Sequence, residues 1–327
     1  MREVIKNIYD YFENLEQKKL PRDKYNNLIY DNDRVAYINT DSCDNRSITI
    51  DDTPYFMKGY NGDCSIVDIA STNMHNCIGI PTPPITTVVK RGEDKDRSQI
   101  FLATQDVHSV DDFLFSIANN MLSEKDFDMQ RFNFRHKWSP LYDMEIKKLF
   151  LKYMTEECFD DLIGLFLVDE LRTEQDRHEN NYFFYKSKKA EKFEGVLPID
   201  NELLSVISHE GKSKQDFINF LHTPTHTVNL FGETEKRTHK KRIEDIKELI
   251  YDQLLNRNQI ELLKRAINYD LPAEIKKVFK NPLLSGTTGI FRSSLNKYKR
   301  SDAIRAYDCI SRLWEYNQKE LGSDLEL

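Results

Sequence analysis

The sequence lacks several features that would place it in a familiar class of proteins. Its five cysteines are odd in number and scattered, and no two of them form a CxxC pair. This pattern argues against a disulfide framework or a structural zinc site, and it is typical of a reducing compartment. No apolar run of about eighteen residues occurs, so the sequence predicts no transmembrane segment. The N-terminal segment is too charged for a secretory signal, and we expect a cytoplasmic protein.

The chain also lacks an excess of positive charge. Its 47 Lys and Arg residues are outnumbered by 54 Asp and Glu residues, which gives a net charge of −7 among 327 residues. Binding to nucleic acid requires a basic surface, so no nucleic-acid partner is expected. A hydrophobic fraction of 39% beside a charged fraction of 31% predicts a folded globular protein rather than a disordered one.

What the sequence does have is a change of periodicity near residue 107. Before this point, short apolar segments separated by turn residues predict strands: VAYINT, SITI, PYFMKGY, ITTVVK and QIFLATQDV. One helix is predicted among them, CSIVDIASTNMHNCIG, and it ends at Gly79. After residue 107 the apolar spacing is mostly helical, beginning with VDDFLFSIANNMLS, and the short segments NYFFYK and GVLPID form a pair of strands. We therefore predict an α+β fold.

The polar stretch TEQDRHENNYFFYK lies between a long apolar helix and an apolar strand. Asp176 and Asn181 are five residues apart in it, and Asp200 ends the second short strand. A hairpin would bring Asp200 back beside Asn181. Carboxylate and amide oxygens suit magnesium, which proteins usually hold with few oxygens of their own. Asp176 would then orient or deprotonate an attacking hydroxyl, as phosphoryl transfer requires.

A lysine upstream completes this set of groups. Lys58 lies in the middle of an apolar strand, where a lysine is costly unless it has a partner. Asp68, on the helix that follows, is the candidate partner. A helix carboxylate paired with a strand lysine would hold the ammonium over the phosphates of a nucleotide.

The order of these residues resembles the HipA-like branch of the protein-kinase superfamily. YFMKGY resembles the lysine strand, VDIASTNMHNCIGIPTPP the helix with its Gly-Ile-Pro exit, and IFLATQDV the strand and hinge beside adenine. DRHENN resembles the catalytic loop, which is also similar to that of phosphatidylinositol-kinase-related enzymes. PID resembles the metal-binding segment that replaces the DFG motif. The resemblance covers roughly residues 34 to 205.

The resemblance implies a two-lobed kinase-like fold that binds ATP and Mg²⁺. It divides the chain into a helical extension at 1–30, an N-lobe at 31–106 and a C-lobe at 107–327. The implied roles are Asp176 as catalytic base, Asn181 and Asp200 as metal ligands, Lys58 on the nucleotide phosphates with Asp68 as its partner, and the backbone of Ala103, Thr104, Gln105 and Asp106 against adenine. His178 would be structural and would pack within the loop.

Three functional hypotheses remain open. The first is a Ser/Thr protein kinase, similar to a bacterial toxin or a translocated effector, with Thr223, Thr225 and Thr227 as candidate phosphosites. The second is a phosphoinositide or small-molecule kinase whose basic clusters at 236–242 and 292–300 face headgroup phosphates. The third is a kinase-shaped binding module without catalysis. The absence of a glycine-rich phosphate loop, and an Asp rather than a Glu at position 68, favour this third hypothesis, whereas the complete set of Asp176, Asn181 and Asp200 disfavours it.

Overall fold

The computed structural model describes eleven stretches of the chain: residues 28–30, 35–39, 46–50, 53–59, 62–90, 99–107, 112–118, 144–201, 213–228, 234–280 and 300–326. Lys6, Asn120, Leu204 and Val206 are also described. The segment 1–27, expected to form most of a helical extension, otherwise lies outside the described residues, as does the basic cluster at 292–299.

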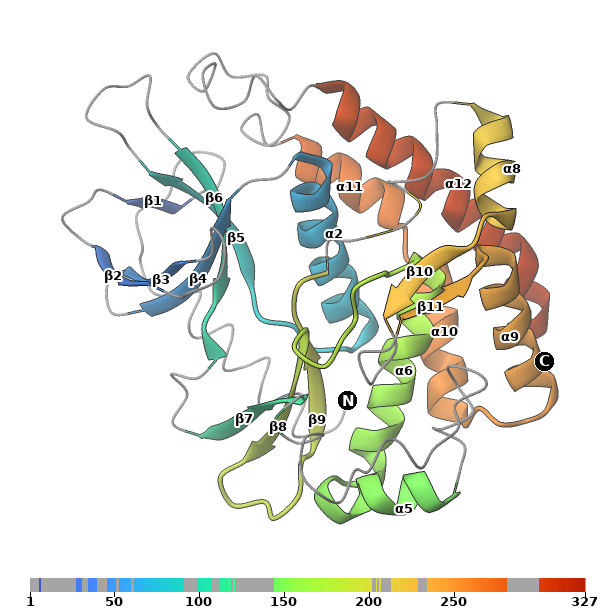
Figure 1. The fold of residues 1–327 in the computed structure, drawn as a ribbon, viewed down its shortest axis with the longest axis horizontal. Helices are drawn as coiled ribbons and strands as arrows, with labels where there is room; N and C mark the ends of the chain where they lie inside the picture. Colours follow the sequence, from blue (N-terminus) through green and yellow to red (C-terminus); the bar gives the residue numbers. More distant parts are fainter. Residues whose placement is uncertain are drawn as a thin grey trace.

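A six-stranded sheet forms one end of the molecule (Figure 1). Its strands are β1 (Leu28–Tyr30), β2 (Val35–Asn39), β3 (Arg46–Ile50), β4 (Thr53–Gly59), β5 (Ile85–Lys90) and β6 (Gln99–Gln105). The order across the sheet is β1-β5-β6-β4-β3-β2. All neighbours are antiparallel except β1 and β5, which run parallel. The predicted strands are thus confirmed as β2 to β6, whereas β1 was not predicted.

Strand β4 lies inside this sheet, between β3 and β6. Tyr55 is buried and its neighbour Phe56 is exposed, as expected for side chains that alternate between the two faces of a strand. The backbone of Lys58 is paired with Leu102 of β6. Lys58 is therefore on the predicted strand, while its side chain lies outside the described part of the structure.

Helix α2 (Gly62–Ile78) follows the sheet strand β4 and ends as predicted. Gly79 takes a φ of 98°, which favours glycine, and its N–H donates to the carbonyl of His75 at 3.1 Å. Helix α2 packs against α10 (Arg257–Asn268), α11 (Leu271–Phe279) and α12 (Arg300–Leu325). It therefore lies between the sheet and the C-terminal helices (Figure 1).

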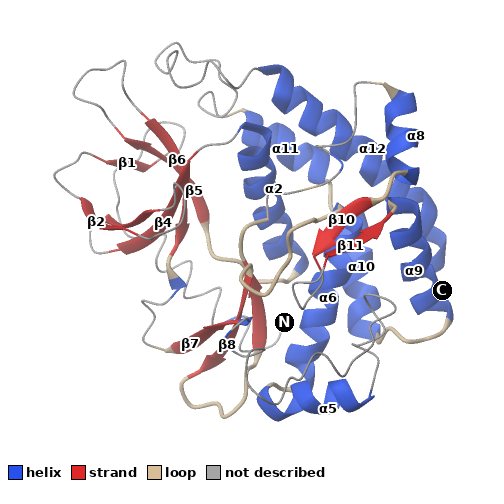
Figure 2. Cartoon of the chain, in the orientation of Figure 1, coloured by secondary structure: helices blue, strands red, loops and turns tan. Residues whose placement is uncertain are grey.

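A second, three-stranded sheet consists of β7 (Phe113–Ile117), β8 (Tyr182–Ser187) and β9 (Gly195–Pro198). Strands β8 and β9 confirm the predicted pair. The helix predicted from VDDFLFSIANNMLS is wrong at Phe113–Ile117, which pairs with β8 as an antiparallel strand (Figure 2). Phe113 and Phe115 are two residues apart and so share one face of the strand. Both rings lie 6.2 Å from the Tyr185 ring of β8, and these contacts favour a strand over a helix.

The rest of the described chain is mainly helical, as the apolar spacing after residue 107 predicts. Its helices are α5 (Met144–Tyr153), α6 (Glu156–Arg172), α8 (Lys214–His222), α9 (His239–Tyr251), α10, α11 and α12. A short hairpin of β10 (Thr225–Val228) and β11 (Thr234–Arg237), which was not predicted, connects α8 to α9.

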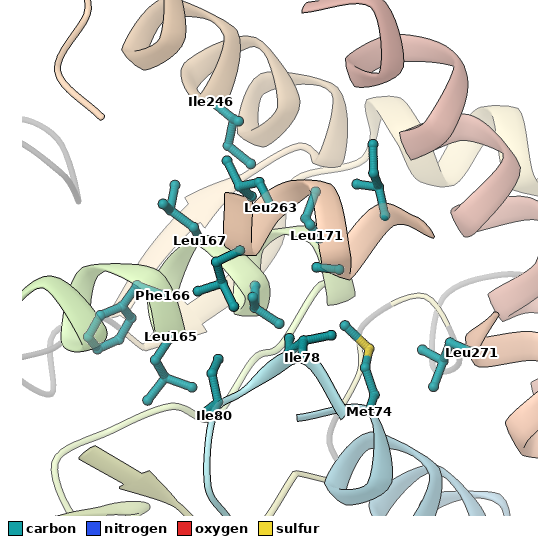
Figure 3. Packing of buried hydrophobic residues seen from close by; sticks show 14 of the residues in the cluster. Met74, Ile78, Ile80, Leu165, Phe166, Leu167, Leu171, Ile246, Leu263 and Leu271 are labelled. Carbon is teal, nitrogen blue, oxygen red and sulfur yellow. The ribbon is translucent and has the colours of Figure 1, made fainter. Parts of the chain in front are cut away.

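The hydrophobic core surrounds α6. Figure 3 shows Leu165, Phe166, Leu167 and Leu171 of this helix among apolar side chains of α2, α9 and α10. Helix α6 begins at the N-cap Thr155, whose side chain accepts from the Cys158 N–H. Its C-terminal end leads directly into the DRHENN stretch, so the core holds the start of that loop. Within the described residues, no helix is long and apolar enough to span a bilayer.

Candidate active site

The loop that carries the DRHENN motif begins at a sharp turn after α6. Thr173 is left-handed, with φ 61°, and its N–H donates back to carbonyls of α6. The Thr173 hydroxyl accepts from the Val206 N–H at 3.2 Å. A non-glycine residue in this conformation needs surrounding contacts to hold it, and these bonds provide them.

Asp176 and Asn181 are joined within the loop. The Asn181 side-chain amide donates to the backbone carbonyl of Asp176 at 2.7 Å and lies 3.5 Å from its carboxylate. Asn181 is buried, whereas the Asp176 side chain is 42% exposed. Because the Asn181 nitrogen is used within the loop, its oxygen is the amide atom left for a cation. Asp176 is open enough to meet a substrate.

The hairpin of β8 and β9 brings Asp200 back to this loop. Tyr182 pairs with Pro198, and the Ile199 N–H donates to the Asn181 carbonyl at 3.0 Å. Burial raises the pKa of Asp176, and the nearby negative charge of Asp200 raises it further. The structure therefore brings Asp176, Asn181 and Asp200 together, as the sequence predicts.

A buried arginine that the sequence analysis missed joins the two sides of this hairpin. Arg177 is 1% exposed and donates through Nε to Asp169 of α6 at 2.9 Å. Its Nη1 donates to the carbonyls of Asn181 at 2.8 Å and Ile199 at 2.7 Å. One side chain thus holds α6, the DRHENN loop and the end of β9 in a fixed relation.

Glu174 was also missed, and it supports the backbone before Asp176. Its Oε1 accepts from the N–H groups of Gln175 at 3.1 Å and Asp176 at 3.2 Å. Its Oε2 lies 3.4 Å from Arg172. Burial raises the pKa of Glu174 to about 7, against the opposing effect of Arg172 and Arg177. The available signal in the sequence was a run of charges at the end of a very apolar helix, since such charges must be paired when buried.

His178 lies within the loop, as the resemblance implies. Its Nδ1 accepts from the Asn180 N–H at 3.1 Å, and its Nε2 lies 3.8 Å from the Asp176 carboxylate. Asn180 itself is exposed. The ring thus shapes the turn beside Asp176.

Asp68 reaches the loop from α2. It is 2% exposed, and its Oδ1 accepts from the Asn201 N–H at 3.1 Å. Asp68 therefore contacts the residue directly after Asp200. Its predicted pairing with Lys58 stays a prediction, because the Lys58 side chain lies outside the described residues.

The segment predicted to meet adenine is the end of β6. Ala103 and Thr104 lie in a central strand with neighbours on both sides, so their backbone groups belong to the two ladders. The Gln105 N–H donates to the Pro84 carbonyl at 3.2 Å. Asp106 lies just beyond the ladder and is half-buried. Which of these four residues meets adenine stays a prediction.

Of the candidate phosphosites, Thr225 is buried and its hydroxyl is engaged. It accepts from Arg242 at 3.1 Å and donates to the Arg237 carbonyl at 3.3 Å. Thr223 is exposed, and its hydroxyl donates to the Asn219 carbonyl at 2.8 Å. A kinase can reach Thr223 more readily than Thr225 in this conformation.

The solved structures that are similar to this fold at a distance include two bacterial proteins. The Helicobacter pylori proinflammatory kinase CtkA has a TM-score of 0.48 and 12% identity, over 84% of this chain and 90% of that one. HipA, from the Shewanella oneidensis MR-1 toxin–antitoxin complex with HipB and operator DNA, has a TM-score of 0.48 and 10% identity, over 96% of this chain and 71% of that one. Both likenesses are too distant to assign a family or an activity to this chain. No family model matches the sequence, and no curated protein is similar to it.

The residues present fit Mg²⁺ and ATP, the two groups that the resemblance implies. The Asp200 carboxylate and the Asn181 side-chain oxygen would be hard ligands for Mg²⁺, and their small number is as expected when the ion is shared with phosphates. Among the described residues, no cluster of three or more His, Cys, Asp or Glu could hold a metal without such help. The Gln105 side-chain nitrogen is buried and has no hydrogen-bond partner in the described structure, and it lies where the adenine contact is expected.

Proposed function

We propose that this protein is an ATP- and Mg²⁺-dependent kinase that transfers the γ-phosphoryl group to a hydroxyl. The observation that carries the proposal is the convergence of Asp176, Asn181 and Asp200 on a loop held by the buried Arg177. A solvated turn would not need a fully buried guanidinium to fix the residues on either side of it. Preorganised groups of this kind are what phosphoryl transfer requires of a protein.

In the proposed reaction, Asp176 orients the substrate hydroxyl and accepts its proton. The hydroxyl oxygen bonds to the γ-phosphorus as the bond from that phosphorus to the bridging oxygen breaks, and ADP leaves. The raised pKa of Asp176 suits this role, because a carboxylate with a higher pKa is a stronger base and accepts a proton more readily. Bound Mg²⁺ would neutralise negative charge on the phosphates. Asn181 and Asp200 would hold it, and Lys58 would contact the same phosphates.

We further propose a two-lobed arrangement and a protein substrate. The six-stranded sheet would form the N-lobe and the helical part the C-lobe, with the nucleotide between β6 and the DRHENN loop. The half-exposed Asp176 is accessible to a Ser or Thr hydroxyl on a protein surface. The resemblance to HipA-like kinases favours the same substrate class.

The proposal is tested with the Asp176→Asn variant in an assay with radiolabelled ATP. We expect phosphoryl transfer to fall by at least about a hundredfold, because general-base catalysis contributes roughly 10²–10⁴ in rate. Asp252→Asn is the matched control, since Asp252 is an exposed residue at the end of α9. Unchanged transfer in Asp176→Asn would exclude this mechanism. Nucleotide binding without transfer in the wild type, on any substrate, would favour the non-catalytic module instead.

The alternative of a phosphoinositide kinase depends on free basic clusters, and the cluster at 236–242 is largely neutralised. Arg237 pairs with Asp245, and Lys241 lies 2.8 Å from the same residue. Arg242 is fully buried, 3.7 Å from Glu170. A headgroup would have to displace these acids, which disfavours lipid binding at this site.

Vesicles containing anionic phosphoinositides distinguish the two substrate classes. We expect no binding that depends on this cluster, so Lys240→Glu with Lys241→Glu should leave vesicle sedimentation unchanged. Loss of sedimentation in that double variant would revive the lipid hypothesis.

A further inference from the structure

Asn201, the residue directly after Asp200, is buried with all its polar groups in use. It is 1% exposed. Its N–H donates to Asp68 Oδ1 at 3.1 Å, and its carbonyl accepts from Arg172 Nη2 at 2.7 Å. Its side-chain oxygen accepts from Arg177 Nη2. Its side-chain nitrogen donates to the hydroxyl at position 72 at 3.4 Å.

These four partners come from three separate parts of the fold. Asp68 and Thr72 are one turn apart on α2, Arg172 is the last residue of α6, and Arg177 is in the DRHENN loop. All four are buried. Asn201 therefore bonds the segment after β9 to α2, to the end of α6 and to the DRHENN loop.

Asp200 lies between two residues whose backbones are fixed. On one side, the Ile199 N–H donates to Asn181 and its carbonyl accepts from Arg177. On the other side, the Asn201 backbone is bound at both its N–H and its carbonyl. Asp200 itself has a φ of 56°, a conformation that a non-glycine residue adopts at a cost. The bonds on both sides hold the backbone there and so fix the direction in which the Asp200 side chain leaves the chain.

We propose that Asn201 is a positioning residue that fixes the Asp200 carboxylate for a divalent cation. The inference rests on the proposed function, because it assigns to Asp200 the role of metal ligand. Residues behind a metal ligand typically change metal affinity by 10–100-fold when they are replaced. Asn201 acts in this way through the backbone of its neighbour as well as through its own side chain.

The experiment measures cation binding rather than turnover. Mn²⁺ replaces Mg²⁺ as a paramagnetic probe, and its affinity for the full chain with a non-hydrolysable ATP analogue is measured by electron paramagnetic resonance. Asn201→Leu removes both side-chain bonds at similar size. We expect it to weaken Mn²⁺ binding by at least about tenfold, while analogue binding without metal stays within about threefold of the wild type.

Two further variants separate positioning from general structure. Asn201→Asp keeps an acceptor for Arg177 and should restore Mn²⁺ affinity to within about threefold of the wild type. Asn180→Leu is the matched control, because Asn180 is an exposed asparagine of the neighbouring loop, and it should bind Mn²⁺ as the wild type does. Should Asn201→Leu fail to fold, Thr72→Val carries the test, since it removes one bond to Asn201 at constant volume. We then expect affinity to fall roughly threefold.

The outcomes distinguish the two proposals. If the wild type binds no Mn²⁺ with the analogue, the proposed function is contradicted. If the wild type binds it and Asn201→Leu binds it equally well, only the positioning role of Asn201 is overturned. Equal affinity in Thr72→Val would overturn that role in the same way, were Asn201→Leu unfolded.

Discussion

Several individual residues beside the candidate site carry buried charges. Asp68, Asp169 and Glu174 provide three carboxylates, and Arg172 and Arg177 provide two guanidinium groups. If all five were ionised, this group would carry one net negative charge in an environment that stabilises charge poorly. Protonation of one carboxylate would balance it, which agrees with a pKa of about 7 for Glu174.

The first residue-scale prediction concerns Glu174 and pH. Its pKa in the folded state is raised to about 7 from a usual value of 4.5. Its stabilising contribution is therefore fully present below pH 4.5 and is lost as the pH rises to about 7. Glu174→Gln should remove this dependence, so that its free energy of unfolding falls less than that of the wild type between pH 4.5 and 7. Urea denaturation at several pH values measures the difference, and parallel curves would contradict the assignment.

The second residue-scale prediction concerns the left-handed backbone of Asp200. Asp200→Gly should be more stable than Asp200→Ala by about 1 kcal/mol, because alanine pays the steric cost of a positive φ and glycine does not. Both variants lose the proposed metal ligand, so neither should show cation-dependent nucleotide binding. Denaturant midpoints compare the pair, and equal stability would argue against a strained backbone at this position.

At the scale of elements, the β8–β9 hairpin is the platform of the site. Asn181 precedes β8, and Asp200 follows β9 by two residues. Gly195 pairs with Tyr185 across this hairpin, and a methyl group at position 195 would overlap the buried tyrosine ring. The close approach of the two strands therefore depends on glycine at this position.

Gly195→Ala should lower the free energy of unfolding by about 1–3 kcal/mol, as overpacking usually does. It should also reduce phosphoryl transfer, because the displaced strand carries Asp200. Gly322→Ala is the control: a methyl group there meets nothing within 4 Å in α12, and alanine should stabilise that helix by up to about 1 kcal/mol. Thermal unfolding checks both variants. An unchanged free energy of unfolding in Gly195→Ala would show that the hairpin accommodates the added methyl group.

Most elements, and the proximity of three candidate site residues, were predictable from sequence for local reasons. Helical spacing predicts α6 and α12, and alternation predicts β8. Asp176, Asn181 and Asp200 came together because a short hairpin leaves few other arrangements. Strand β7 was not predictable, because acidic residues before FLFSI resemble a helix start and its pairing partner is distant in sequence. Arg177 and Asn201 were missed because nothing in the local sequence shows that a charged or amide side chain of a loop is buried.

At the scale of the whole molecule, Glu174 and His239 have opposite effects on how stability changes with pH. His239 is buried at the start of α9, and its ring bonds Asn317 of α12 at 2.8 Å. Burial lowers the pKa of His239 to about 4 from 6.5. Its contribution to stability is therefore present above pH 6.5 and is lost as the pH falls toward 4, opposite to that of Glu174.

We expect these two contributions to compensate between pH 4.5 and 6.5. Relative to the wild type, Glu174→Gln should lose stability on acidification, and His239→Gln should gain stability on acidification. The side chains of Glu174 and His239 bond to different residues, Arg172 and Asn317, so their effects should largely add and the double variant should follow the pH dependence of the wild type. Denaturation curves across this pH range test the prediction. A free energy of unfolding that changes more steeply with pH in the double variant than in the wild type would contradict compensation.

The packing of α2 has a consequence for how the molecule would open. Asn73 of α2 donates to Glu274 of α11 at 2.8 Å, and Asp68 accepts from Asn201. Helix α2 is therefore bonded to the helical part of the molecule. The chain then leaves α2 for β5 through the proline-rich residues 81–84, a stiff connection. If the sheet moved relative to α2, Lys58 would move with it while Asp68 kept its bond to Asn201. In the proposed kinase, the carboxylate side of the site would thus already be assembled before a nucleotide binds.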